Sequence, residues 1–246
     1  MKKQLFITLL ISIFGLLAYG QNKKLDFEKL DDAVVLVMRF DEFGEFIGHG
    51  SGFIIDEEGI VVTNYHVLKD AYAIKVKTED GAMYEMEKIL AGSEEIDLAK
   101  FKIKKHVPNE RFPRVQISNQ FPKKDNQIWA IGSPLDTILM NTLSKGIISK
   151  TYFNGYPGLS LGKVLQMNAE IYHGSSGGAL FNTKGEIVGV TSGGRKDAAE
   201  KSLHINFAIW IGELNSLPLI NKEKIFDETK LRVKLSFLHE LQYDRK

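Results

Sequence analysis

Short apolar and β-branched runs alternate with turns rich in Gly, Asn and Asp along most of the chain. Runs of this length, bounded by turn residues, are typical of β-strands and not of helices that pack in a core. We predict strands at residues 33–40, 52–55, 60–63, 73–77, 98–103, 127–131, 146–149, 164–167, 179–181, 187–191 and 206–209. So many short strands at this spacing predict an all-β protein that folds into barrels or sandwiches.

Two turns carry the clearest hairpin signals. One, at 56–59 with the sequence DEEG, joins the second and third predicted strands, and the other, at 182–185 with the sequence NTKG, follows the strand predicted at 179–181. Each turn ends on a glycine, which adopts a positive φ at little steric cost. We therefore predict an antiparallel hairpin at each turn.

A proline-containing segment divides the predicted strands into two groups. Residues 106–124 hold three of the six prolines and show little periodicity, which indicates a connector. The expected order is a signal peptide at 1–20, a lead-in at 21–32, a domain at 33–212 with barrels at 33–115 and 127–212, and a partly helical tail at 213–246.

The first twenty residues have the layout of a secretory signal peptide. Lys2 and Lys3 precede an apolar run at 5–18, and the small residues Ala18 and Gly20 suit a cleavage site. The alternative is an uncleaved anchor, but the run is shorter than the roughly 20 apolar residues that span a bilayer. We expect an exported protein, periplasmic or secreted, without stable membrane insertion after cleavage.

Composition narrows the classes of partner and cofactor. The 246 residues are 43% apolar and carry 32 Lys+Arg against 31 Asp+Glu, a formal charge of +1, so nothing indicates a nucleic-acid partner. The chain has no cysteine, which excludes disulfides, a thiol nucleophile and Cys-bound zinc. His239-Glu240 lacks the second histidine of a zinc-peptidase motif. We expect neither a metal nor a cofactor.

A glycine-flanked serine is the strongest chemical signal. The stretch GSSGGALF at 174–181 places Ser176 before an apolar strand, among glycines that turn tightly and present backbone N–H groups. A flexible Gly/Ser loop is the simpler interpretation. The stretch also fits the nucleophile elbow of α/β-hydrolases, with Asp197 and His204 following, but that elbow needs a helix after the serine, and here a strand, a turn and a strand follow.

A nucleophilic serine needs a base and a carboxylate that orients it. Of the six histidines, His66 lies where the apolar strand at 60–63 ends, and Asp97 opens the strand at 98–103. Taken alone, His66 could be structural and Asp97 a turn residue. The order His, Asp, Ser is the one used on paired β-barrels. It places the base and the carboxylate in the first half and Ser176 in the second, with a site between them.

These stretches resemble the trypsin-like serine peptidases of the HtrA/Deg type. The matching stretches occur in family order from about residue 33 to 210. They are GSGFII at 50–55, GIVVTNYHVL at 59–68, DLA at 97–99, IGSP at 131–134, GIIS at 146–149, GSSGG at 174–178, GEIVGV at 185–190 and NFAI at 206–209. The resemblance covers the peptidase domain, and we expect no counterpart of the family's C-terminal PDZ modules.

The resemblance implies two six-stranded antiparallel barrels of the chymotrypsin-like type, with short helical N- and C-terminal segments, and endopeptidase activity. By position, Ser176 is the nucleophile, His66 the general acid and base, and Asp97 the orienting carboxylate. The loop Gly174-Ser175-Ser176 forms the oxyanion hole, with the N–H groups of Gly174 and Ser176 as donors. Ser175 stands where zymogen-type relatives carry an aspartate, so we expect no proteolytic activation.

The resemblance also suggests a substrate pocket formed by Glu170, Ile171, His173, Thr191 and Ser192. Glu170 lies six residues before Ser176, near the position that shapes primary specificity in trypsin-like enzymes. If its carboxylate points into the pocket, cleavage follows Lys or Arg; the alternative is a solvated loop carboxylate. A homo-oligomer is possible but not indicated, because the segment ahead of the domain is short.

The leading prediction is an exported serine endopeptidase that acts on proteins or peptides, with a role in protein quality control. The alternative is a catalytically silent barrel protein that binds peptides or unfolded clients in the same cleft. A third class, a soluble esterase, predicts alternating helices and strands instead of an all-β fold.

Overall fold

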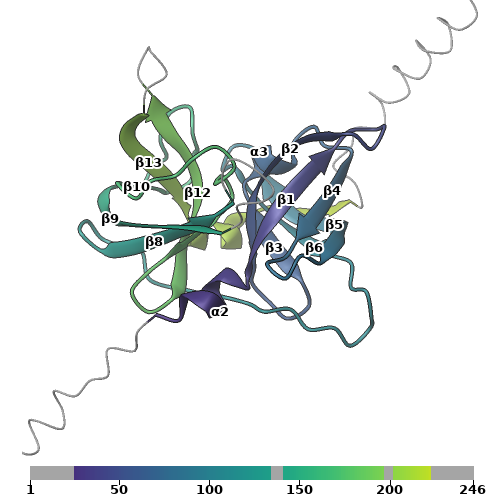
Figure 1. Ribbon diagram of the computed structural model, residues 1–246. Coiled ribbons are helices and arrows are strands. Elements are labelled where there is room, and N and C mark those ends of the chain that lie inside the picture. The colour runs from purple at the N-terminus through teal and green to yellow at the C-terminus, as the bar shows by residue number, and fades with distance from the viewer. Residues whose placement is uncertain (1–24, 134–140, 197–201, 223–246) are drawn as a thin grey trace, which may run out of the picture.

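Two β-barrels stand side by side in the computed structural model, which describes residues 25–133, 141–196 and 202–222 (Figure 1). The signal peptide predicted at 1–20 and most of the predicted tail lie outside these residues. None of the helices in the described part has both the length and the apolar character needed to cross a membrane.

The first barrel is a closed antiparallel sheet with the strand order β5-β4-β1-β2-β3-β6, and a β5–β6 pairing completes the ring. Its strands are β1 (Val34–Phe40), β2 (Phe46–Ile54), β3 (Ile60–Thr63), β4 (Ala73–Lys77), β5 (Met83–Ser93) and β6 (Leu98–Ile103). A short helix, α3 (Tyr65–Leu68), follows β3.

The second barrel has the strand order β11-β8-β9-β10-β13-β12 and is closed by a β11–β12 pairing. Its strands are β8 (Gln127–Gly132), β9 (Thr142–Tyr152), β10 (Val164–Met167), β11 (Ala179–Phe181), β12 (Glu186–Lys196) and β13 (Ser202–Trp210). Two closed six-stranded antiparallel barrels are the chymotrypsin-like fold, so the predicted fold class is confirmed. The all-β topology also excludes the α/β-hydrolase alternative.

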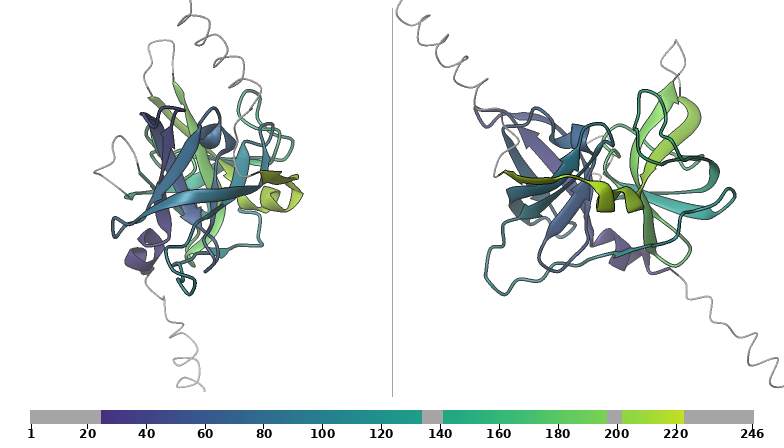
Figure 2. Two further views of the ribbon diagram at one scale, coloured as in Figure 1. Left: turned by 90° about the vertical axis from the view of Figure 1, so that its right-hand side faces the viewer. Right: turned by 180° about the vertical axis from the view of Figure 1, so that it is seen from behind.

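In the described part of the chain, four further short elements lie outside the twelve barrel strands given above. β7 (Gln116–Ile117) lies in the connector and pairs in parallel with β12. The helix α2 (Phe27–Asp31) precedes β1. After β13, the 3₁₀ helix η1 (Ile211–Ser216) lies at the boundary between the barrels, and β14 (Leu219–Lys222) adds to β5 of the first barrel (Figure 2).

Each of the eleven predicted runs overlaps a strand, with only Ala33 and Ile55 falling one residue outside β1 and β2, and both predicted hairpin turns form as expected. Gly59 and Gly185 have φ values of +85° and +77°. In each turn a side-chain oxygen accepts two backbone N–H bonds: Asp56 Oδ1 from Glu58 and Ile60, and Asn182 Oδ1 from Lys184 and Glu186. β5, β7 and β14 were not predicted.

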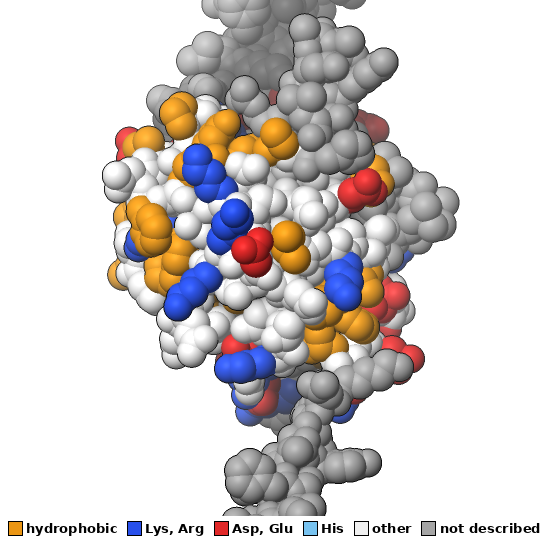
Figure 3. All heavy atoms as spheres, turned by 90° about the vertical axis from the view of Figure 1, so that its left-hand side faces the viewer, with side chains coloured by type: hydrophobic (Ala, Val, Ile, Leu, Met, Phe, Trp, Pro, Cys, Tyr) orange, Lys and Arg blue, Asp and Glu red, His pale blue; other side chains and the backbone are white. Residues whose placement is uncertain are grey.

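Three apolar clusters hold the barrels together and to each other. One fills the first barrel and another fills the second. The third joins the two, because Phe53 and Leu98 of the first barrel pack with Phe181 and Ile209 of the second, all fully buried. This shared core fixes the strand ends that face the boundary between the barrels. The outer face that Figure 3 shows carries several separate hydrophobic groups with lysine and arginine side chains among them.

The carboxyl group of Asp31, at the end of α2, provides a test of stability against pH. Burial raises its pKa from 3.8 to about 6, and the charges of Glu79 and Asp32 contribute to the rise. The folded chain therefore binds this proton more tightly than the unfolded chain, and stability falls as the pH rises from about 4 through about 6.

Asp31→Asn is therefore expected to stabilise the protein at pH 7.5 by on the order of 1 kcal/mol, after allowance for the screening of a partly exposed group. Urea unfolding at pH 7.5 and at pH 3.5 measures the effect. The gain should disappear at pH 3.5, where Asp31 is largely protonated in both states. An equal gain at both pH values would contradict the electrostatic explanation.

Candidate active site

His66 lies in α3, immediately beyond the end of β3. Val67 and Leu68 of the same helix are buried in the first barrel, which anchors the turn, while the side chain of His66 is 49% exposed. Asn64, which is buried where β3 ends, donates from Nδ2 to the backbone oxygen of Asp97 at 2.9 Å. The backbone on either side of His66 is therefore fixed, and its ring faces the boundary between the barrels.

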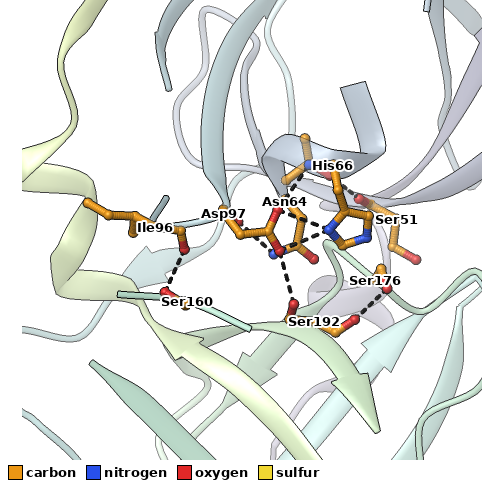
Figure 4. Close-up of polar contacts among 9 residues, drawn as sticks. Ser51, Asn64, His66, Ile96, Asp97, Ser160, Ser176 and Ser192 are labelled. Atoms are coloured by element: carbon orange, nitrogen blue, oxygen red, sulfur yellow. Dashed lines mark hydrogen bonds and ion pairs between the residues drawn. The ribbon is translucent and has the colours of Figure 1, made fainter. Parts of the chain in front are cut away.

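Asp97 precedes β6 in a left-handed conformation, with φ of +60°. Aspartate tolerates this conformation better than most residues, and here it turns the carboxylate toward His66. The carboxylate accepts from the His66 backbone N–H at 2.9 Å, from His66 Nδ1 at 2.9 Å and from Ser192 Oγ at 3.0 Å (Figure 4). Because a carboxylate only accepts, Nδ1 carries the hydrogen, and Nε2 is left as the basic nitrogen.

Ser176 enters from the second barrel, in the loop between β10 and β11. Its hydroxyl lies beside the His66 ring in Figure 4 and donates to the backbone oxygen of Ser192 at 2.6 Å. Among the described residues, that oxygen and not the His66 ring is the partner of the hydroxyl. The structure thus brings the three predicted residues together from two barrels, with the Asp97–His66 contact formed and the hydroxyl turned to Ser192.

Three carbonyl groups of the loop point into the protein framework. Ser51 Oγ donates to the oxygen of Gly174 at 2.7 Å, and Thr191 Oγ1 donates to that of Ser175 at 2.5 Å. The backbone N–H of Ser51 donates to the oxygen of Ser176 at 2.7 Å. The N–H groups of Gly174 and Ser176 have no hydrogen-bond acceptor among the described residues. These two N–H groups are the donors that the sequence predicts for an oxyanion hole, and that role stays a prediction.

Ser51 is a site residue that the sequence reasoning did not single out. Besides its two bonds to the loop, its hydroxyl accepts from the Ser133 N–H at 2.8 Å, and its own backbone oxygen accepts from Thr63 Oγ1 at 2.7 Å. The signal that could have found it lies in the GSGFII stretch at 50–55, which contributes to the family resemblance. There a serine stands between two glycines ahead of an apolar run, a place that suits a bridging hydroxyl.

The loop depends on Gly177, whose φ is +88°. A Cβ atom there would lie 2.1 Å from the oxygen of Ser51 and 2.2 Å from Thr63 Oγ1. Gly177→Ala is expected to cost about 3 kcal/mol of stability, or to displace the loop and slow the reaction of Ser176 with an activated-serine reagent by at least roughly ten-fold. Urea unfolding and the rate of labelling measure the two effects.

Gly81→Ala is the matched control, because Gly81 has φ of +86° and a Cβ atom added there would meet nothing within 4 Å. Gly81→Ala is expected to lower the free energy of unfolding by about 1 kcal/mol, because only the left-handed backbone conformation disfavours alanine there. Equal losses in the two variants would contradict the packing argument for Gly177.

A pocket of about 330 Å³ adjoins His66 and Asp97. It is lined by Tyr65, His66, Lys69, Glu94, Asp97, Gly158, Leu159 and Ser192. Lys69 and Glu94 form an ion pair at its edge, and this hydrogen bond raises the pKa of Lys69. Tyr65, Lys69, Glu94, Gly158 and Leu159 were missed, because they come from loops and helix ends of both barrels without a sequence pattern.

Of the residues predicted to form the substrate pocket, Ser192 lines this one. Thr191 is buried beneath the loop, and Ile171 packs against the core of the second barrel. Glu170 and His173 are exposed, and the Glu170 carboxylate accepts from the Tyr172 hydroxyl at 2.6 Å. That bond raises the pKa of Tyr172. The role of Glu170 in specificity stays a prediction.

The described residues contain no group of three or more His, Cys, Asp or Glu side chains placed to hold a metal ion. The groups gathered in this cleft are a hydroxyl, an imidazole, a carboxylate and backbone N–H groups. Together with two closed six-stranded barrels, this set defines the class of chymotrypsin-like serine peptidases.

Comparison with known proteins gives the family. Residues 50–190 match the trypsin-like peptidase domain. The chain is 37% identical over 164 residues to the serine endoprotease DegS of Escherichia coli K12, which covers 65% of this chain and 44% of DegS. It is 35% identical over 147 residues to the serine protease HTRA4 of Mus musculus, covering 58% of this chain and 29% of that protein.

A third relative is the anti-sigma-I factor RsgI9 of Acetivibrio thermocellus, 30% identical over 209 residues, which is 82% of this chain and 28% of that protein. The chain thus spans less than half the length of these relatives. It belongs to the trypsin-like serine peptidase family, and the predicted resemblance to the HtrA/Deg type is confirmed. The predicted enzyme class, a serine-type endopeptidase, is that of its DegS and HTRA4 relatives.

Proposed function

We propose that the protein is an exported serine endopeptidase that hydrolyses peptide bonds with Ser176 as nucleophile, His66 as general base and acid, and Asp97 as the orienting carboxylate. The observation that carries the proposal is that these three side chains meet at the boundary of the two barrels. The Asp97 carboxylate accepts hydrogen bonds from the backbone and the ring of His66 and from the Ser192 hydroxyl, which fixes its position beside the ring. Protein or peptide substrates follow from the kinship with serine endoproteases.

Each step of hydrolysis has a group at hand. His66 Nε2 takes the proton of Ser176 as Oγ attacks the substrate carbonyl, and the Asp97 carboxylate stabilises the imidazolium. The N–H groups of Gly174 and Ser176 receive the negative oxygen of the tetrahedral intermediate. His66 then protonates the leaving amine, and water repeats the sequence on the acyl-enzyme.

Binding of substrate prepares the nucleophile in this scheme. The Ser176 hydroxyl donates to the Ser192 oxygen at 2.6 Å before substrate arrives. A substrate N–H that bonds to that oxygen replaces the hydroxyl, which then turns to His66 Nε2. The hydroxyl is thus released toward its base by the molecule it attacks.

Export and a role in protein quality control complete the proposal. Export is supported by the basic start and apolar run within residues 1–20. The quality-control role is supported by the kinship with HtrA-type serine proteases. Cleavage of unfolded in preference to folded proteins is the behaviour that this role requires.

The test is the intact mass of the purified protein after treatment with a fluorophosphonate, a reagent that phosphonylates activated serines. One adduct on the wild type and none on Ser176→Ala is the expected result. A folded wild type without an adduct would overturn the proposal. It would favour the alternative of a catalytically silent protein that binds peptides. In such a protein the Ser176 hydroxyl would stay bonded to the Ser192 oxygen and would not turn to His66.

A further inference from the structure

The two sides of Ser176 differ, and their geometry gives a direction to the cleft. In any residue the backbone nitrogen lies about 2.4 Å from the carbonyl carbon. Ser176 Oγ attacks the carbonyl carbon of the substrate residue that precedes the scissile bond. The backbone N–H of that substrate residue is then within reach of the Ser192 oxygen, which lies 2.6 Å from Oγ. The substrate segment before the scissile bond therefore runs past Ser192 and the pocket with Leu159.

A segment that continues past Ser176 in the opposite direction would meet β2. Figure 4 shows Ser51 of β2 on the side of His66 away from Asp97. The Ser51 N–H donates to the Ser176 oxygen at 2.7 Å, so β2 meets the nucleophile at Ser51, and its first residues, back to Phe46, lie progressively farther from Ser176.

The outer half of β2 offers an open strand edge. β1 pairs with β2 along Phe46–Phe53, but β3 pairs with it only at Phe53 and Ile54. Within the described strands, residues 46–50 therefore have a β-neighbour on one side only. An extended peptide can add to such an edge as a further strand.

A row of two stacked rings, those of Phe46 and His49, lies along this part of β2. The ring of Phe46 stacks on that of His49 with centroids 6.3 Å apart and an angle of 16°, and it meets Phe40 edge-on at 6.0 Å. The row ends at the loop of the nucleophile, since a Cβ atom on Gly174 would lie 2.5 Å from His49 Nε2. The His49 ring thus lies beside Gly174, a residue proposed for the oxyanion hole, and the Phe46 ring stacks on the His49 ring.

A β-bulge creates this row. The β1–β2 register passes from Arg39 opposite Gly48 to Phe40 opposite Phe46, so Ile47 is the extra residue, and Gly48 has φ of +141°. Without the bulge, Phe46 and His49 would face opposite sides of the strand. With it, both rings share one side, and Phe46 stays 48% exposed and Ile47 43% exposed.

From these contacts we infer that the outer half of β2 binds the substrate segment that follows the scissile bond, and that the Phe46–His49 ring pair selects an apolar or aromatic side chain there. His49 and Phe46 lie two and five residues before Ser51. Because extended strands rise about 3.3 Å per residue, a substrate strand paired with β2 would bring roughly the second to fourth residue after the scissile bond to these rings. The inference rests on the proposed peptidase function and adds a specificity determinant to it.

The experiment compares wild type, Phe46→Ser and Phe46→Tyr with the control Phe153→Ser. Phe153 is 61% exposed on the second barrel, where it packs on Phe121, so it controls for loss of an exposed ring. Digestion of a random peptide mixture by the wild type first defines a cleaved sequence. Two quenched fluorescent peptides then share that sequence and differ only in carrying Phe or Ser at the second to fourth positions after the bond.

We expect the wild type to cleave the Phe peptide with about ten-fold higher kcat/KM than the Ser peptide, the size of effect that one apolar contact gives. Phe46→Ser should lose this preference, whereas Phe46→Tyr and Phe153→Ser should retain it. Fluorophosphonate labelling should proceed at the wild-type rate in all variants, because the reagent has no segment on this side.

Two failures are distinguishable. A wild type that is labelled and cleaves peptides without this preference, or a Phe46→Ser variant that keeps it, overturns the inference and leaves the peptidase proposal standing. A folded wild type that is neither labelled nor able to cleave any peptide of the mixture overturns both.

Discussion

Ser176→Ala and His66→Ala are each expected to reduce kcat by about 10⁶-fold, and the double variant should be no slower than either single one. The reason is that the two groups act as a unit: without the imidazole the hydroxyl keeps its proton, and without the hydroxyl the imidazole has nothing to activate. Hydrolysis of a fluorescent peptide, followed over hours at high enzyme concentration, measures the residual rates.

Neither substitution should unfold the protein. His66 is about half exposed, and the Ser176 side chain has one hydrogen bond, so thermal unfolding should stay within a few degrees of the wild type. His106→Ala is the control for loss of an exposed histidine, because His106 lies in the connector and stacks on Tyr84. Multiplicative losses in the double variant would contradict a shared role of Ser176 and His66.

Asp97→Asn is expected to reduce kcat by about 10⁴-fold with little change in the fold. The asparagine side chain is of nearly equal size, but its NH₂ group can face His66 Nδ1 only if that nitrogen has no hydrogen. The hydrogen then moves to Nε2, and the base that faces Ser176 is lost. Peptide hydrolysis measures the loss, and NMR of the histidine ring nitrogens reports the exchanged tautomer.

Asp70→Asn is the matched control for this variant. Asp70 follows α3, is exposed, and has φ of +61°, nearly the value of Asp97, so asparagine meets the same backbone demand in both. It should leave kcat unchanged. Loss of activity in Asp70→Asn as well would assign the effect to the backbone conformation instead of the tautomer.

The sequence predicted strands well where one face of the strand is buried. β3 and β10 are short apolar runs, and both were predicted to the residue. β5 was missed because Glu85, Glu87 and Lys88 interrupt its apolar positions, and several of its side chains face solvent. β7 and β14 were missed because each exists only through pairing with a distant strand. Local patterns carry no information about such partners.

At the candidate site, the sequence indicated the residues with distinctive chemistry but not those that hold them. Ser176, His66 and Asp97 were predicted from their types, neighbours and order, and they meet in the structure. Ser51 and Asn64 were not, because a serine and an asparagine near a strand end are common and their partners lie far away in the chain. The pocket beside His66 draws on loops of both barrels, and strand patterns do not predict where loops meet.

The hydrogen bonds that Ser51 makes to the nucleophile loop connect the two barrels, and this matters while the protein is not fully folded. One residue of the first barrel binds the carbonyl groups of Gly174 and Ser176 in the second, so neither barrel alone contains the complete set of groups that the proposed mechanism uses. A chain still being made, or one whose barrels have come apart, lacks the geometry to attack its neighbours. Under the proposed function, peptidase activity therefore requires both barrels to be folded and packed together.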